Sequence, residues 1–100
     1  MDVYYTVRAA RRIELIHKRW KKADLPYLFK EELRTAEQRI LDNPHLATPM
    51  KQTRRGWTIR AVLLPKTEQW VYYRIDERRQ RIVVYTVWGA RRRRRPALPG

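Results

Sequence analysis

Apolar residues along the chain recur first with a strand-like and then with a helix-like period. Residues 3–7 are β-branched and aromatic, which favours a short strand. After them, apolar residues three and four positions apart place one stripe along a helix predicted over residues 8–22. The stripe consists of Ala9, Ile13, Ile16 and Trp20.

A second helix is predicted to begin near Asp24 and Pro26. An aspartate accepts hydrogen bonds from free backbone N–H groups, and proline is tolerated in a first helical turn. The helix should end at Asn43-Pro44, because proline cannot continue the hydrogen-bond ladder. Its apolar stripe consists of Phe29, Leu33, Ala36 and Ile40. The short connection to the first helix predicts an antiparallel helical hairpin.

The second half of the chain changes to strand-like segments. Residues 45–56 have no periodicity and are predicted to form a loop. Three segments rich in Val, Ile, Tyr and Trp follow, joined by short polar links, and they predict an antiparallel meander over residues 57–64, 70–75 and 82–88. The predicted fold class is α+β, in the order β-α-α-β-β-β. An N-terminal strand precedes an antiparallel helical hairpin, which packs on a C-terminal antiparallel three-stranded meander because neither layer buries its apolar side alone.

A chain of 100 residues has room for one hydrophobic core. We assign residues 1–90 to a single domain and residues 91–100 to a basic, proline-containing C-terminal tail with no structure of its own. The start lacks a signal-peptide pattern, and no apolar run is long enough to span a membrane. We therefore expect a cytoplasmic protein with no membrane partner.

Charge indicates the kind of partner. Lys and Arg number 24 against 10 Asp and Glu, which gives a formal net charge of +14 and favours nucleic acid, a membrane surface or an acidic protein. The chain has no cysteine, so disulfides, thiolate zinc sites and a cysteine nucleophile are excluded. It also has no clustered metal ligands and no glycine-rich phosphate loop, so we expect no metal and no cofactor.

The last third of the chain resembles a known family. Residues 71–76 (VYYRID) and 82–92 (IVVYTVWGARR) are similar to the terminal hairpin of RelE/ParE superfamily toxins. Residues 8–13 and 29–33 resemble the starts of that family's two helices, and Asn43-Pro44 falls where its second helix commonly ends. The resemblance spans residues 3–96. It implies a compact α+β fold, growth inhibition, and neutralisation by an antitoxin, typically acidic and encoded next to the toxin.

The family has two activities, and fold alone does not decide between them. ParE-like members bind DNA gyrase and trap it on DNA, whereas RelE-like members cut messenger RNA on the ribosome. The long helices, the Tyr-Tyr-Arg-Ile-Asp strand and the basic C-terminal end favour gyrase poisoning. A ribosome-dependent mRNA endoribonuclease is the alternative, so whether the protein is an enzyme stays open. A plain nucleic-acid-binding protein is a third possibility, suggested by basic and aromatic residues but by no helix-turn-helix signal.

RNA cleavage requires a base, a proton donor and positive charge near the scissile phosphate. If the chain is a ribonuclease, the candidate catalytic residues are Arg60, Arg74, Tyr85 and Arg91. A good base is harder to find, because Trp88-Gly89 stands where many ribonucleases of the family carry a histidine, although some members manage with Lys, Arg and Tyr alone. His17 and His45 are predicted to be ordinary surface histidines.

Candidate residues for binding the target or nucleic acid are Arg60, Arg74, Trp88, Arg91, Arg92 and Arg93. Strand alternation places Val71, Tyr73 and Ile75 on one face of the sheet, and Trp70, Tyr72 and Arg74 on the other, which we expect to be exposed. The alternative is that the arginines are solvated and the aromatic residues pack between strands. The predicted site depends on Arg60, Arg74 and Arg91 gathering on one face around the last strand.

Overall fold

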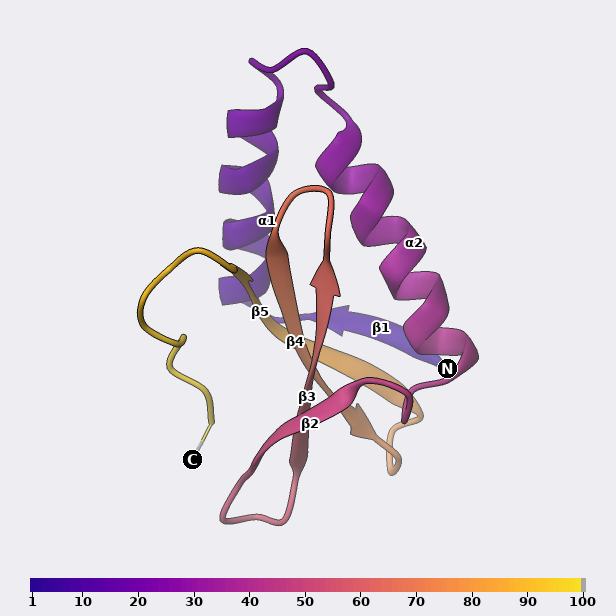
Figure 1. The fold of residues 1–100 in the computed structure, drawn as a ribbon. Coiled ribbons are helices and arrows are strands. Elements are labelled where there is room, and N and C mark those ends of the chain that lie inside the picture. Colours follow the sequence, from indigo (N-terminus) through magenta and orange to yellow (C-terminus); the bar gives the residue numbers. More distant parts are fainter. Residues whose placement is uncertain (100) are drawn as a thin grey trace.

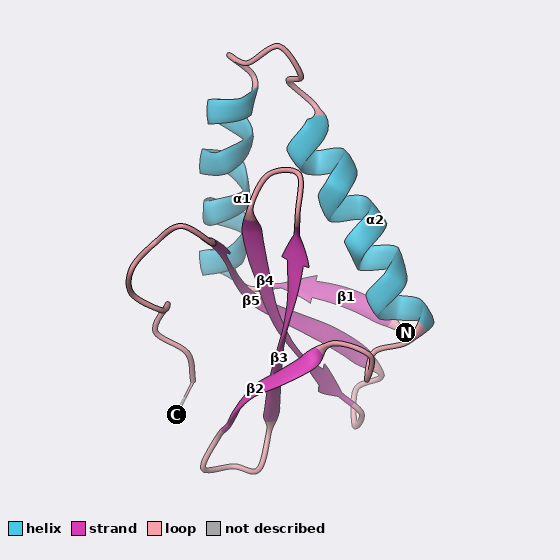
Figure 2. Ribbon diagram, viewed as in Figure 1, coloured by secondary structure: helices cyan, strands magenta, loops and turns pink. Residues whose placement is uncertain are grey.

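A five-stranded sheet carries two helices on one face in the computed structural model, which describes residues 1–99 (Figure 1). The elements are β1 (Asp2–Tyr5), α1 (Val7–Trp20), α2 (Leu28–Asp42), β2 (Thr48–Gln52), β3 (Thr58–Leu64), β4 (Gln69–Asp76) and β5 (Arg81–Gly89). The strand order is β1-β5-β4-β3-β2, with β1 parallel to β5 and the other pairs antiparallel (Figure 2). The predicted α+β class and element order are confirmed, with β2 as an additional strand.

The start of α1 is set by Thr6. Its Oγ accepts a hydrogen bond from the backbone N–H of Ala9 at 3.1 Å and donates to the carbonyl of Tyr85 at 2.9 Å. This cap ends the first strand at Tyr5, so the prediction that the strand continues to Val7 is wrong. The helix also ends at Trp20, two residues before the predicted boundary.

The second helix begins later than predicted. Asp24 and Pro26 lie in the connection between the helices, and α2 starts at Leu28 after Tyr27, whose side chain makes no capping hydrogen bond. The prediction that the helix begins near Asp24 and Pro26 is therefore wrong. The predicted apolar stripe is confirmed, because Phe29, Leu33, Ala36 and Ile40 are all buried. The two helices run antiparallel, as Figure 1 shows.

The main core lies between the helices and the sheet. Phe29 and Ile16 from the helices meet Val71, Tyr73 and Val84 from the central strands. Phe29 and Tyr73 have no exposed surface. The Tyr73 hydroxyl donates to the carbonyl of Pro44 at 2.7 Å, so β4 also fixes the segment that follows α2.

The strand β2 was not predicted, and assigning residues 45–56 to a loop was wrong. Thr48–Gln52 pairs antiparallel with β3, with a register shift between Pro49 and Lys51. It is an edge strand with mostly exposed residues, so it lacks the apolar alternation that marks a half-buried strand.

The other face of the sheet is covered, which corrects the expectation that Trp70, Tyr72 and Arg74 are exposed. Tyr72 has 4% and Arg74 9% of its surface exposed. Tyr72 packs with Ile59 and Ala61 in a second cluster, against which Trp70, Trp88 and Leu98 also pack. The C-terminal segment that contributes Leu98 has no helix or strand, yet its Pro96 is buried. The predicted tail therefore contacts the sheet.

Candidate functional site

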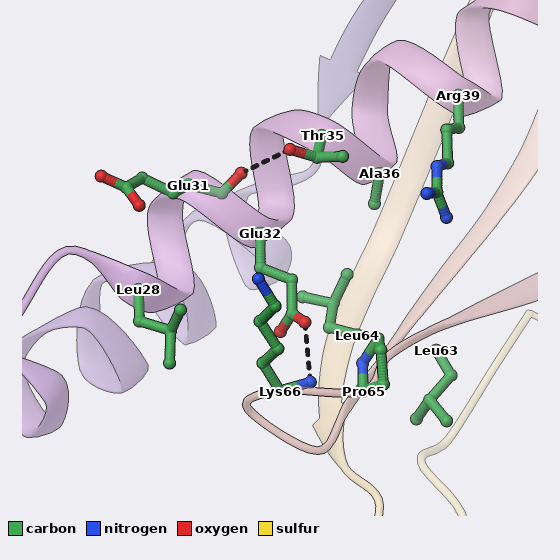
Figure 3. Close-up of a pocket in the computed structure, with 10 residues that line it drawn as sticks. All are labelled: Leu28, Glu31, Glu32, Thr35, Ala36, Arg39, Leu63, Leu64, Pro65 and Lys66. Atoms are coloured by element: carbon green, nitrogen blue, oxygen red, sulfur yellow. Dashed lines mark hydrogen bonds between the residues drawn. The ribbon is translucent and has the colours of Figure 1, made fainter. Parts of the chain in front are cut away.

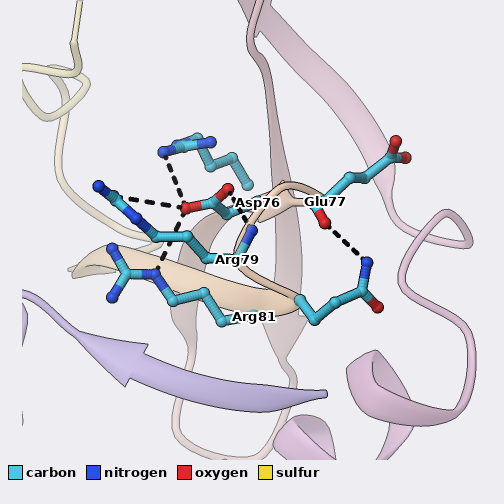
Figure 4. Close-up of polar contacts among 6 residues, drawn as sticks. Asp76, Glu77, Arg79 and Arg81 are labelled. Carbon is cyan, nitrogen blue, oxygen red and sulfur yellow. Dashed lines mark hydrogen bonds and ion pairs between the residues drawn. The ribbon is translucent and has the colours of Figure 1, made fainter.

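Asp76 is the centre of a charged cluster at the end of β4. Its Oδ2 lies 3.6 Å from Nη2 of Arg74, 3.8 Å from Nη1 of Arg79 and 3.4 Å from Nε of Arg81 (Figure 4). The backbone N–H of Arg79 also donates to Oδ1 at 3.2 Å. Asp76 and Arg81 are cross-strand partners at the β4–β5 turn, so the hairpin itself builds the cluster. One buried carboxylate is thus shared by three guanidinium groups.

The protonation of Asp76 follows from this arrangement. Burial alone would raise the pKa of the carboxyl group, but the N–H of Arg79 and the charges of Arg74 and Arg81 hold it below its usual value. The carboxylate is therefore charged at neutral pH. Three cations around one anion leave the cluster with excess positive charge.

The guanidinium group of Arg74 is covered by the ring of Trp57. Its Cζ lies 3.8 Å from the centroid of Trp57, and Arg55 lies 5.1 Å from the same ring. Nε of Arg74 and Oη of Tyr85 are both buried and have no hydrogen-bond partner among residues 1–99. Burial raises the pKa of the Tyr85 phenol, against the opposing charge of Arg74, so the phenol stays protonated. Arg74 and Tyr85 are thus predicted site residues that lie next to each other on one face of the sheet.

Arg60 does not join them. Its cross-strand partner is Tyr73, whose side chain belongs to the core under the helices, so Arg60 projects from the opposite face to Arg74. There its Nη1 donates to the carbonyls of His45 and Ala47, at 3.1 and 2.7 Å. The pairing of β3 with β4 stops at Arg60 and Tyr73, and the strand ends then diverge. Arg60 and Arg74 border the resulting hollow of about 380 Å³ from its two sides.

The remaining predicted residues lie at the far end of β5. Arg91 pairs with Glu68 in the β3–β4 turn, Nε to Oε2 at 2.6 Å. Arg92 stacks on Trp88, with its Cζ 4.3 Å from the ring centroid, and Arg93 is exposed. The predicted gathering of Arg60, Arg74 and Arg91 around the last strand is therefore wrong: the three occupy separate places.

The two histidines differ in their surroundings. His17 is 6% exposed, so the prediction of a surface histidine is wrong for it, and its Nδ1 has no partner within residues 1–99. Burial, together with the charges of Lys30 and Lys21, lowers its pKa, which keeps the ring neutral. His45 is exposed and borders the hollow beside Arg60.

A second hollow, of about 280 Å³, lies between α2 and the β3–β4 turn (Figure 3). Glu32 crosses it, with Oε2 accepting from the backbone N–H of Lys66 at 2.7 Å and Oε1 accepting from the backbone and hydroxyl of Thr67 at 2.9 and 2.7 Å. Glu32 thereby fastens the turn to the helix, which is a structural role.

Several residues of the Asp76 cluster were not predicted. Asp76 itself, its partners Arg79 and Arg81, and Trp57, which covers Arg74, were not among the predicted site residues. One signal was available: Arg74 and Asp76 are two residues apart in a strand and so share a face. Across the part of the chain that the structure describes, no group of three His, Cys, Asp or Glu lies close enough together to hold a metal ion. None of the described helices is long and apolar enough to cross a membrane.

Comparison with known proteins gives structural matches only. No protein-family model and no curated protein matches the sequence. The isolated RelE toxin of E. coli superimposes with a TM-score of 0.61 at 16% identity, over 91% of this chain and 85% of that one. A chain of the intact E. coli RelBE toxin–antitoxin complex gives the same score and identity, with 91% of this chain and 98% of that one covered. The chromosomal ParDE system of P. aeruginosa gives 0.60 at 12% identity, with 89% and 95% covered. The chain therefore has the RelE/ParE toxin fold, as its sequence predicted.

Proposed function

We propose that this chain is the toxin of a type II toxin–antitoxin pair and arrests bacterial growth by binding and poisoning DNA gyrase. An acidic antitoxin, encoded next to the gene for this chain, neutralises the toxin. Support for the pair comes from the fold, because two of the similar structures are toxin–antitoxin systems, RelBE and ParDE. The net charge of +14 favours an acidic partner, because opposite charge speeds association and suppresses wrong partners.

The choice of gyrase rests on how the arginines are engaged. A phosphoryl-transfer site needs cations aimed at one reacting phosphate. Here Arg60 is bound to two carbonyls, Arg74 to Asp76 and Arg91 to Glu68. Arg60 and Arg74 project from opposite faces of the sheet, and Arg91 lies at the far end of β5. Cations held in structural contacts favour a protein that acts by binding its target over one that assembles a catalytic centre.

A ribosome-dependent endoribonuclease is the second candidate, favoured by the pair of Arg74 and Tyr85. Arg74 Nε and Tyr85 Oη are buried polar atoms with no hydrogen-bond partner among residues 1–99, and the ring of Trp57 covers Arg74. In that activity Arg74 would stabilise the phosphorane and Tyr85 would donate the proton to the leaving oxygen.

Two assays with purified full-length protein separate the candidates. The first incubates the protein with gyrase and supercoiled DNA, and accumulated cleaved DNA is expected. The second adds it to translating ribosomes, and codon-positioned breaks in the messenger RNA would instead support the ribonuclease. The Tyr85→Phe variant keeps the ring and removes the hydroxyl, so it should poison gyrase undiminished but would lose RNA cleavage.

Growth supplies the wider test of the pair. Expression of the chain alone should arrest growth, and co-expression of the protein encoded by the adjoining gene should restore it. Unimpaired growth with abundant soluble protein would contradict the toxin assignment, whichever target is considered.

A further inference from the structure

A second positively charged surface lies where α1 meets the end of β5 and the C-terminal segment. Four arginines share it: Arg8, Arg12 and Arg19 of α1, and Arg92 of the C-terminal segment. On a helix, residues 8, 12 and 19 lie within one narrow stripe, so the three helical arginines face the same way. We call this group, together with Trp88, the α1 basic patch.

Trp88 organises the patch. Cζ of Arg92 lies 4.3 Å and Cζ of Arg12 5.7 Å from the centroid of its ring. A guanidinium group stacked on a ring keeps its N–H donors at its rim, where they are free to bind the oxygens of a phosphate. The ring thus holds two planar cations in place for an anion.

Hydrogen bonds fix the three segments to one another. Nε of Arg12 donates to the carbonyl of Val87 at 3.3 Å, and Nε1 of Trp88 donates to the carbonyl of Arg94 at 2.9 Å. Arg8 also donates to the carbonyl of Ala97. These bonds use backbone acceptors, so they order the arginines without neutralising them.

No carboxylate of residues 1–99 neutralises the patch. None of its four arginines forms an ion pair with any acid within residues 1–99. Burial, and then the charges of Arg92, Arg19 and Arg8, lower the pKa of Arg12, as expected where like charges are gathered. Holding these cations together has a cost in free energy that a bound polyanion would offset.

We propose that the α1 basic patch binds the phosphodiester backbone of nucleic acid. The stripe from Arg8 to Arg19 extends roughly 16 Å along α1 at about 1.5 Å per residue. Duplex DNA carries one negative charge per roughly 1.7 Å of axis, so a stretch of this length presents enough phosphates to engage all four arginines. The phosphate backbone of a nucleic acid carries only negative charges. A patch of four arginines with no acid between them therefore complements it.

This site is distinct from the Asp76 cluster and does not depend on gyrase or the ribosome. A toxin that acts on gyrase would use it to hold the DNA that gyrase carries, but the binding itself is a property of the isolated chain. Nucleic-acid binding by the patch can therefore be refuted while the proposed toxin function stands, and the toxin function can be refuted while the patch still binds nucleic acid.

The test measures binding of labelled nucleic acid to purified full-length protein by fluorescence anisotropy over a range of salt concentrations. One arm uses a 20-base-pair duplex DNA and another a 20-nucleotide single-stranded RNA, to distinguish the source of the phosphates. The variant R19Q/R92Q removes two cations that make no hydrogen bond in the structure within residues 1–99, so the fold is not put at risk. The matched control R34Q/K51Q removes two exposed charges elsewhere, from α2 and β2.

The wild-type chain should bind at least one of the two probes, and R19Q/R92Q should weaken binding roughly ten-fold or more. Loss of two phosphate contacts should also lower the slope of log K against log salt by about 1.8 for the duplex or about 1.4 for the single strand. R34Q/K51Q should change both quantities much less. Equal weakening by the two double variants would overturn the proposal, since net charge alone would then account for binding. Failure to bind either probe, with binding of an acidic peptide such as polyglutamate instead, would also overturn it.

Discussion

Replacing Tyr73 with phenylalanine tests how the helical layer is fastened to the sheet. Tyr73 is completely buried, and its hydroxyl donates to the carbonyl of Pro44 at 2.7 Å. Phenylalanine keeps the packed ring and leaves the carbonyl without that donor. An unsatisfied buried acceptor costs about 1–3 kcal/mol. Because Pro44 is only half-buried, water reaches part of the site, and we expect a loss of about 1–2 kcal/mol.

Urea unfolding followed by circular dichroism measures this loss. For a small domain the free energy of unfolding falls by about 2 kcal/mol per molar urea, so a loss of about 1–2 kcal/mol should lower the midpoint by roughly 0.5–1 M with an unchanged slope. Tyr27→Phe is the matched control, because Tyr27 is 64% exposed and its hydroxyl makes no hydrogen bond in the structure within residues 1–99. If Tyr73→Phe moves the midpoint no further than Tyr27→Phe, the bond to Pro44 contributes nothing and the reasoning is refuted.

Three further changes probe the fold. Phe29→Ala should lower the free energy of unfolding by about 3–5 kcal/mol, because it leaves a cavity at a fully buried site. Calorimetry should show a lower melting temperature, and an unchanged melting temperature would contradict this prediction. Thr6→Ala should cost about 1 kcal/mol by removing the cap of α1, whereas Thr6→Ser should keep most of it in the same urea titration. The lowered pKa of His17 means that the unfolded chain binds its proton first, so stability should fall as pH drops from about 7 to about 5. His17→Gln should flatten that pH profile, and parallel profiles for the two proteins would contradict the assignment.

Periodicity was enough to predict the helices because each helix buries one side, as the stripe from Phe29 to Ile40 does. The central strands were predicted from their content of Val, Ile, Tyr and Trp, which suits β4 because it is covered on both faces. The strand β2 has no such signal. It is held by backbone pairing to β3 at an exposed edge, and its sequence, TPMKQ, contains the proline that normally argues against a strand.

The candidate site was harder to predict because it depends on register. The partner of Arg60 across the β3–β4 pair is Tyr73, the neighbour of Arg74, and a shift of one residue at the turn would have placed the two arginines on the same face. A bulge in β5 likewise changes which face of the sheet its side chains occupy. The register shift opposite Tyr72 and Tyr73 places Trp88 on the face of Tyr85, although the two are an odd number of residues apart. Neither feature has a reliable signature in a single sequence.

The scarcity of acids accounts for where the charged surfaces lie. The ion pairs among residues 1–99 draw on three carboxylates: Asp76 serves three arginines, Glu68 serves Arg91, and Glu14 serves Lys30. With 24 basic residues and 10 acidic ones, most cations are left without a partner, and compact folding brings some of them together. The gathering occurs where α1 and the C-terminal segment meet at the end of β5, because both segments contribute arginines to that edge and none of residues 1–99 contributes an ion-pairing acid to it. A partner that relieves this repulsion must therefore present negative charge to α1 and to the C-terminal segment at once.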